Sequence, residues 1–168
     1  QGLNDNDRFL TAARISAPLL KTHMGDLPLR LTMGANGYLN TVTTDVSASD
    51  RQGWGFDSQL TVGGFELPAE ILGLSTEAAT QPAVRSLGWN VLVAWKLPAA
   101  PDWTVVARFE SYEANTAATD TRSENRVLGM TYRLRGDDLR FSVNYILGNP
   151  AGPLSQQGRL LTGAQLIY

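Results

Sequence analysis

The chain has 168 residues, with 14 Lys and Arg against 16 Asp and Glu, one His and no Cys. This length allows one ordinary domain, and no run of about 18 apolar residues predicts a transmembrane helix. Because basic and acidic residues are nearly balanced, the sequence gives no indication of a nucleic-acid partner, and we expect none.

Apolar and polar residues alternate with a period of two along most of the chain, which is the pattern of β-strands whose two faces meet different environments. In the N-terminal half the alternating segments are residues 8–19, 27–40 and 54–62. Residues 69–76 (AEILGLST) have two almost equally apolar faces. We predict a strand there because its neighbours need a partner between them.

The C-terminal half alternates more regularly, in segments 86–97, 103–110, 127–134, 139–148 and 158–168. The last segment, GRLLTGAQLIY, ends on an aromatic residue, as the closing strand of an outer-membrane β-barrel does. Segments of about ten residues with apolar and polar positions in alternation are typical of such barrels. The whole chain therefore predicts about nine strands.

The predicted connections alternate between short and long. Short connections are expected at 21–26, 66–68, 98–102 and 135–138, and longer ones at 40–51, 77–84, 114–125 and 149–157. Short periplasmic turns and longer extracellular loops characterise transmembrane barrels, so the C-terminus is expected on the periplasmic side. The Ser, Thr and Asp-rich stretches 41–50 and 117–124 are expected to be solvated loop tips or partner contacts.

Aromatic residues on the apolar side of the predicted strands are expected near strand ends, at the two membrane interfaces. The expected membrane girdle consists of Trp54, Trp89, Trp95, Trp103, Tyr132 and Tyr168. A water-soluble barrel or sandwich also shows alternation, but it would bury its Trp residues centrally.

These features predict an all-β protein, a single transmembrane antiparallel up-and-down β-barrel domain over residues 1–168. An alternative architecture drops segment 8–19 as a strand and leaves eight strands, which would close as a small barrel with a filled interior. Such a barrel would be an anchor or a structural subunit of an envelope assembly, without transport. Pairing of residues 8–19 with 27–40 distinguishes the two.

Several stretches carry a resemblance to a known family. They are GWNVLVAWKLP, WTVVARFESYEANT, RVLGMTYRLRG, LRFSVNYILG and GRLLTGAQLIY, with GWGFDSQLTVGGFELPAEI upstream. In order and spacing they resemble the C-terminal region of the phosphate-selective porins of Gram-negative outer membranes. Glu70 stands where such porins often carry an inward glutamate. The chain departs from the family in ending on Tyr instead of the usual Phe and in having about half the length.

The resemblance implies a barrel of about 16 strands, of which this chain is the C-terminal half. It also implies a trimer in the outer membrane, with lipid bilayer and lipopolysaccharide as surroundings, and an arginine-lined pore. A larger envelope complex is the other assembly considered.

The side chains that the alternation directs inward include a surplus of basic residues. The candidate pore-lining residues are Arg14, Arg30, Asp57, Gln59, Glu70, Lys96, Arg108, Glu110, Arg133, Arg140, Asn144 and Arg159. Fixed positive charge in a narrow pore raises the local anion concentration, and arginine suits oxyanions such as phosphate. We therefore expect a passive, weakly anion-favouring porin. Pairing of Arg14, Arg30 and Arg108 with the carboxylates of Asp57, Glu70 and Glu110 would instead stiffen the wall and leave little selectivity.

No catalytic constellation, metal site or cofactor site is expected. The single His23 falls in a predicted short turn, away from Asp57, Glu70 and Glu110. We therefore do not expect these carboxylates to form a catalytic site in which a histidine activates a nucleophile. The sequence also contains no cluster of metal-ligating residues. We expect no enzymatic activity.

Overall fold

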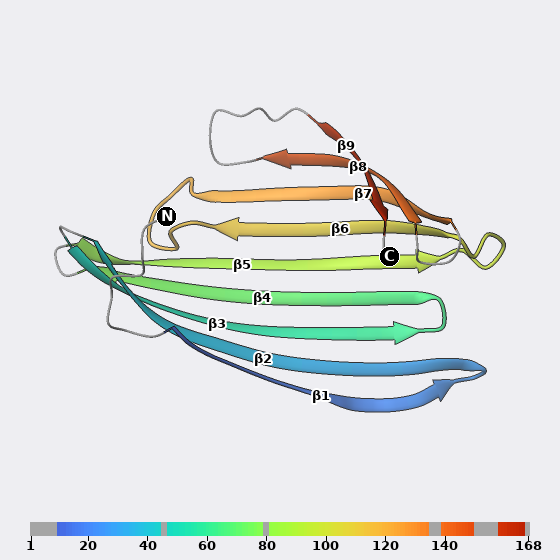
Figure 1. Cartoon of the computed structure of the whole chain (residues 1–168), viewed down its shortest axis with the longest axis horizontal. Helices are drawn as coiled ribbons and strands as arrows, with labels where there is room; N and C mark the ends of the chain where they lie inside the picture. The colour runs from blue at the N-terminus through green and yellow to red at the C-terminus, as the bar shows by residue number, and fades with distance from the viewer. Residues whose placement is uncertain (1–9, 45–46, 79–80, 135–138, 150–157, 167–168) are drawn as a thin grey trace.

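The computed structural model of the chain describes residues 10–44, 47–78, 81–134, 139–149 and 158–166. These residues form one antiparallel sheet with nine strands in sequence order (Figure 1). The strands are β1 (Thr11–Met24), β2 (Leu27–Thr44), β3 (Ser47–Val62), β4 (Phe65–Ala78), β5 (Gln81–Lys96), β6 (Trp103–Glu113), β7 (Arg122–Leu134), β8 (Leu139–Asn149) and β9 (Arg159–Leu166). The described ranges contain no helix that is long and apolar enough to cross a membrane.

The prediction of nine strands is confirmed, including the ambiguous segment 69–76, which lies within β4. β1 pairs with β2 from Thr11 opposite Leu39 to Met24 opposite Leu27. The eight-stranded architecture, which lacks this pairing, is therefore wrong. The β1–β2 register shifts between Pro18 and Leu20, where a proline has no N–H to give to the ladder.

Turns of different sequence connect the strands at one end of the sheet. Gly25 and Gly63 have φ values of 62° and 56° and begin two-residue connections, which require a left-handed residue that glycine adopts without steric cost. Between β5 and β6, Ala100 N donates to Leu97 O at 3.2 Å and Trp103 N donates to Ala100 O at 2.9 Å. The predicted turn at 98–102 is confirmed, whereas 66–68 belongs to β4. The predicted turn at 135–138 lies outside the described residues.

At the opposite end, two predicted loops are mostly strand. The β2–β3 ladder continues through Thr41 opposite Asp50, where Thr41 Oγ1 donates to Asp50 Oδ1 at 2.6 Å. The β4–β5 ladder similarly continues to Ala78 opposite Gln81. The predictions of loops at 40–51 and 77–84 are therefore wrong, because polar β-branched and small residues pair as readily as the apolar ones below them. Between β6 and β7 the loop is 114–121, and the predicted loop 149–157 lies almost wholly outside the described residues.

The sheet has two chemically distinct faces. Residues directly opposite each other on neighbouring strands project to the same side, so the register assigns every strand position to a face. We call the face that carries Asp57 and Glu70 the polar face, and the face that carries Trp54, Val91 and Leu128 the apolar face. Among the described residues, Val127 on the polar face is the only buried hydrophobic side chain, with 6% exposure. The sheet therefore has no hydrophobic core of its own.

The apolar face is an oblique band. On β5 its apolar residues run from Leu87 to Trp95, but the register position of Leu87 is occupied by Glu113 on β6 and by Arg122 on β7. On β7 the apolar residues run from Leu128 to the other end of the strand. The edge of the band thus crosses the strands at an angle, as it does when strands tilt through a flat apolar layer.

Both outer strands of the sheet are exposed along their full described length. In the described part of the chain, β1 pairs only with β2, and β9 only with β8. Since β1 and β9 are both odd-numbered strands of an antiparallel sheet, they run in the same direction.

Candidate functional site

All candidate pore-lining residues lie on the polar face. The register connects them across the sheet, for example Asp57 opposite Glu70, Arg30 opposite Thr61, and Arg133 opposite Arg140. This face also holds residues that the sequence analysis did not select, among them Lys21, Arg51 and Glu66. Arg51 and Glu66 were missed because both fall in stretches that were predicted to be connections.

A row of carboxylate and amide side chains crosses the polar face at one register position. From β3 to β7 it consists of Asp57, Glu70, Asn90, Glu110 and Asn125, each directly opposite the next. Asn90 Nδ2 donates to Glu70 Oε2 at 3.3 Å, and Asn125 Nδ2 donates to Glu110 Oε1 at 2.9 Å. Asn90 therefore separates Glu70 from Glu110, and the two amides hold these carboxylates in position, whereas Asp57 and Glu70 face each other directly.

Two of the three carboxylates also have an arginine partner. Arg14 Nη2 of β1 binds both carboxylate oxygens of Asp57 on β3, and Arg108 Nε lies 3.1 Å from Glu110 Oε2. The Arg14 and Arg108 side chains are 55% and 39% exposed, so solvent reduces the stabilisation that either pair contributes.

Glu70 differs from the other two carboxylates. Its hydrogen bond comes from Asn90, and no cation pairs with it among the described residues. Arg30 lies opposite Thr61 and Lys21, at a different register position from Glu70. The alternative in which Arg14, Arg30 and Arg108 all pair with these carboxylates therefore holds for Arg14 and Arg108 but not for Arg30 among the described residues. Inward direction alone does not specify the register between strands.

The polar face carries more cations than carboxylates. Its described basic residues are Arg14, Lys21, Arg30, Arg51, Lys96, Arg108, Arg133, Arg140 and Arg159, and its acidic residues are Asp57, Glu66, Glu70 and Glu110. Near the short-turn end, Arg133 Nη2 donates to Thr104 Oγ1 at 3.2 Å. The excess of positive charge extends from β1 to β9.

The polar face has a hollow beside the carboxylate and amide row. It has a volume of about 300 Å³ and is lined by Arg14, Thr32, Asp57, Gln59, Glu70 and Asn90, among others. Its lining can donate and accept hydrogen bonds and presents charges of both signs, as suits a hydrated solute. No group of His, Asp and Glu within the described ranges is arranged to hold a metal ion.

On the apolar face, aromatic residues form two groups at the two edges of the band. Near the short turns, Phe65 stacks on Trp95 with centroids 5.3 Å apart, and Trp103 contacts Tyr132 at 4.8 Å. At the other edge, Trp54 contacts Phe56 at 5.7 Å and Trp89 contacts Phe109 at 5.2 Å.

The expected position of Trp54 and Trp89 near strand ends is wrong. Both lie in the middle of their strands, β3 and β5, because these strands continue beyond the apolar band. Arg126 lies over the Phe109 ring, 5.7 Å from its centroid, where the band ends on β7. Tyr168 lies outside the described residues.

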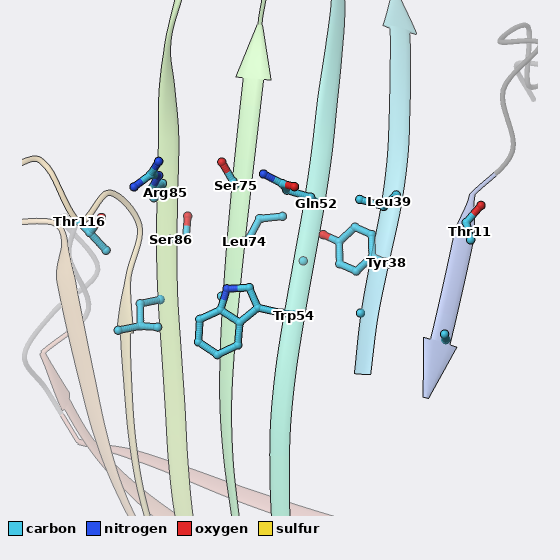
Figure 2. A pocket seen from close by; sticks show the side chains of 15 residues that line it. Thr11, Tyr38, Leu39, Gln52, Trp54, Leu74, Ser75, Arg85, Ser86 and Thr116 are labelled. Carbon is cyan, nitrogen blue, oxygen red and sulfur yellow. The ribbon is translucent and has the colours of Figure 1, made fainter. Parts of the chain in front are cut away.

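A second, larger hollow lies mainly on the apolar face, across β1 to β5. Its volume is about 760 Å³. Figure 2 shows Arg85, Ser75 and Gln52 at one end of it and Trp54 at the other. Ala13, Gly37 and Gly73 also line it, and these residues have at most a methyl side chain.

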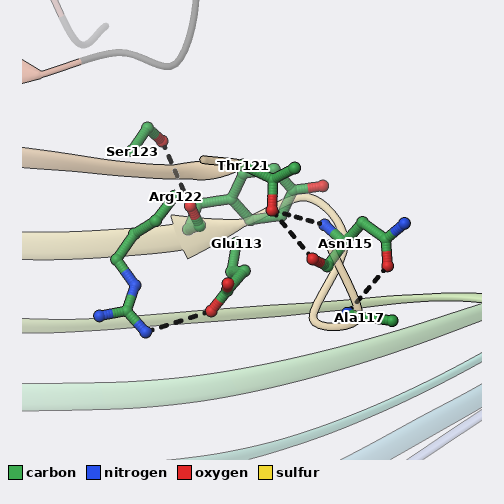
Figure 3. Close-up of polar contacts among 7 residues, drawn as sticks. Glu113, Asn115, Ala117, Thr121, Arg122 and Ser123 are labelled. Atoms are coloured by element: carbon green, nitrogen blue, oxygen red, sulfur yellow. Dashed lines mark hydrogen bonds and ion pairs between the residues drawn. The ribbon is translucent and has the colours of Figure 1, made fainter. Parts of the chain in front are cut away.

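The loop 114–121 borders this hollow through Thr116. Thr121 Oγ1 accepts from Asn115 N at 3.4 Å and donates to Asn115 O at 2.9 Å, while Asn115 Oδ1 accepts from Ala117 N at 3.0 Å (Figure 3). At the base of the loop, Arg122 Nη2 lies 3.2 Å from Glu113 Oε2. The side chains of Asn115 and Thr121 thus replace the missing ladder hydrogen bonds of the loop.

No protein-family model and no curated protein matches the sequence. Among solved structures, the chain is similar to a loop L8 deletion mutant of OmpT, an outer membrane protein of Vibrio cholerae, with a TM-score of 0.59 and 17% identity. The similarity covers 97% of this chain and 55% of that chain. This chain therefore has the fold of slightly more than half of an outer membrane protein.

Proposed function

We propose that the chain forms part of the wall of an outer-membrane β-barrel, with its apolar face toward lipid and its polar face toward the lumen. The observation that carries the proposal is the exposed apolar band, which is obliquely bounded by charged residues and edged by aromatic pairs. Leu128 is 60% exposed. An apolar side chain of this size gains about 1.5–3 kcal/mol of transfer free energy when it moves from water into an apolar environment. Lipid provides that environment, and the interfacial aromatics match a membrane girdle.

Closure of the barrel requires strands beyond the nine described here. Because β1 and β9 run in the same direction, joining them directly would create a parallel pair. An up-and-down barrel instead needs an odd number of further antiparallel strands between them. This agrees with a porin of about 16 strands, of which this chain would supply the C-terminal half.

The proposed activity is passive diffusion of small hydrophilic solutes with a weak preference for anions, including phosphate and other oxyanions. It is supported by the excess of arginine and lysine on the polar face, whose field concentrates anions in a confined lumen. Arg14 and Arg108 are partly offset by Asp57 and Glu110, which favours a weak rather than a strict selectivity.

The proposed setting is the outer membrane of a Gram-negative-type bacterium, with the C-terminus in the periplasm. It is supported by tight turns at one end of the sheet and by strands that extend past the band at the other. Lipid and lipopolysaccharide would surround the barrel, as a homotrimer or within a larger envelope complex.

The test is the reversal potential of the native polypeptide in a planar bilayer under a KCl gradient. We expect a potential of the sign that indicates chloride preference, and a smaller potential for the double variant Arg30→Gln with Lys96→Gln. The matched control is Arg122→Gln, whose charge lies on the other face. Absence of conductance would contradict the porin proposal, and cation preference would contradict its anion selectivity.

A further inference from the structure

We infer that the hollow on the apolar face, which we call the lipid hollow, binds one phosphorylated glycolipid of the outer leaflet. An acyl chain would lie beside Trp54, and a headgroup phosphate would bind Arg85. The inference rests on the proposed function, because the apolar face must lie in a membrane for a lipid to reach it.

The shape of the lipid hollow suits an acyl chain. Ala13 and Gly37 leave the β1–β2 pair without bulky side chains at the register position where β3 carries Trp54. A Cβ at Gly37 would find its nearest neighbour, Gly53 O, at 3.4 Å, so the space above this residue is open. The Trp54 indole lies over Gly73 and forms a rigid side for the hollow, and Leu39 and Leu87 complete the apolar lining.

The polar end of the hollow suits a phosphate on a sugar. Arg85 precedes Leu87 by two residues on β5 and lies on the same face, directly outside the apolar band. In the proposed orientation this is the level at which lipid headgroups begin. A guanidinium can bind a phosphate through two parallel hydrogen bonds. Gln52, Ser75 and Thr116 surround this end (Figure 2) and offer amide and hydroxyl groups for sugar hydroxyls.

Arg85 differs from the two other arginines at this edge of the apolar face. Arg122 pairs with Glu113, and Arg126 lies over Phe109. Within the described part of the chain, Arg85 has neither a carboxylate partner nor an aromatic ring. Its charge is therefore available to an external anion, and the adjoining apolar hollow favours an anion that carries an acyl chain.

The loop 114–121 fixes the wall of the hollow beside Arg85. Thr116 N donates to Arg85 O at 2.8 Å, and Ser86 Oγ donates to Ala114 O at 2.8 Å. The loop is thus joined to β5 at two consecutive residues, Arg85 and Ser86. Such preorganisation reduces the conformational entropy that the protein loses when it binds a lipid. The long-strand end of the sheet, proposed to be extracellular, places this site in the leaflet that carries phosphorylated glycolipid.

The experiment measures binding of lipid A to the native polypeptide in detergent by native mass spectrometry. We expect one tightly bound lipid A, and an affinity about tenfold lower in Arg85→Gln, since a hydrogen-bonded charge is removed. Gly37→Leu, which fills the hollow and keeps the charge, should lower the affinity similarly. Arg126→Gln, which removes a charge at the same edge but outside the lining of the hollow, is the matched control and should bind as the unaltered protein does.

Two further lipids identify the source of the recognised phosphate. Phosphatidylglycerol and phosphatidylethanolamine should each compete at least tenfold less effectively than lipid A. Equal competition by phosphatidylglycerol, or unchanged binding in both Arg85→Gln and Gly37→Leu, overturns the inference. Insertion into vesicles is measured on the same preparation, so that a protein that inserts but does not bind lipid A contradicts only the lipid site. Failure to insert contradicts the proposed function.

Discussion

Arg14 of β1 reaches Asp57 of β3 across Gly34, the β2 residue that lies directly opposite Asp57. A Cβ on Gly34 would collide with the Asp57 carboxylate and press on the Arg14 guanidinium. The glycine thereby permits an ion pair that ties the exposed outer strand β1 to the strand beyond its neighbour. The pair also places an arginine and a carboxylate together at the polar-face hollow.

Replacing Gly34 with a bulkier residue should loosen this edge of the sheet. We expect Gly34→Val to lower the free energy of unfolding by about 1–3 kcal/mol, because the new side chain displaces Asp57 and breaks its pair with Arg14. The measurement is equilibrium unfolding in urea from lipid vesicles, followed by tryptophan fluorescence. Gly37→Ala is the control, since its new methyl group would meet only Gly53 O, at 3.4 Å. Equal destabilisation of both variants would show that the ion pair is not the cause.

A charge in the middle of the apolar band should be far more costly than one beyond its edge. Val91→Arg places a guanidinium at mid-band on β5 and is expected to lower the free energy of unfolding from vesicles by about 2–4 kcal/mol. Gln52→Arg lies on the same face but beyond Trp54, and its expected cost is about 0–1 kcal/mol. Urea titration in vesicles gives both values. Similar costs at the two positions would mean that the band does not mark the depth of the hydrocarbon.

Glu70 should weaken anion preference in the unaltered protein. Its carboxylate is held by Asn90 and has no cation partner among the described residues, so Glu70→Gln removes a negative charge from the polar face. We expect the chloride-to-potassium permeability ratio to rise by about 1.5-fold to threefold, as the local anion concentration increases. Reversal potentials under a KCl gradient measure the ratio. Glu77→Gln, on the apolar face, should leave the ratio unchanged. An equally unchanged ratio for Glu70→Gln would place Glu70 away from the ion path.

The loop 114–121 should become accessible to protease when its side-chain hydrogen bonds are lost. Thr121→Val removes the hydroxyl that both donates to and accepts from Asn115, so we expect cleavage in the loop to be at least threefold faster. Ser123→Ala, which removes a single weak bond of 3.4 Å to Tyr112 O, is the control. The assay uses intact cells, because an extracellular loop is cut by added protease. Cleavage only after the outer membrane is opened would reverse the proposed orientation.

Sequence periodicity predicted the number of strands and the face of each candidate residue, because a period of two directly reflects strand geometry. It placed Asp57, Glu70 and Glu110 on one side but not at one register position. That alignment depends on turn lengths, and the turn at Gly63 and Gly64 precedes the predicted one. Hydrophilic stretches such as 41–50 were predicted to be loops, although ladder hydrogen bonds require only backbone groups. The lipid hollow gave no sequence signal, since Ala13, Gly37 and Gly73 lie on different strands, β1, β2 and β4, and share a register position only in the folded sheet.

Each described strand pairs only with the strands before and after it in the sequence. Long-range closure is therefore absent from the ladders within this part of the chain, and every pairing forms between segments that are close in sequence. Local pairings of this kind have a small loop-closure entropy, so assembly can advance one hairpin at a time. An assembly factor that accepts single hairpins could therefore build this wall in chain order, from β1 to β9.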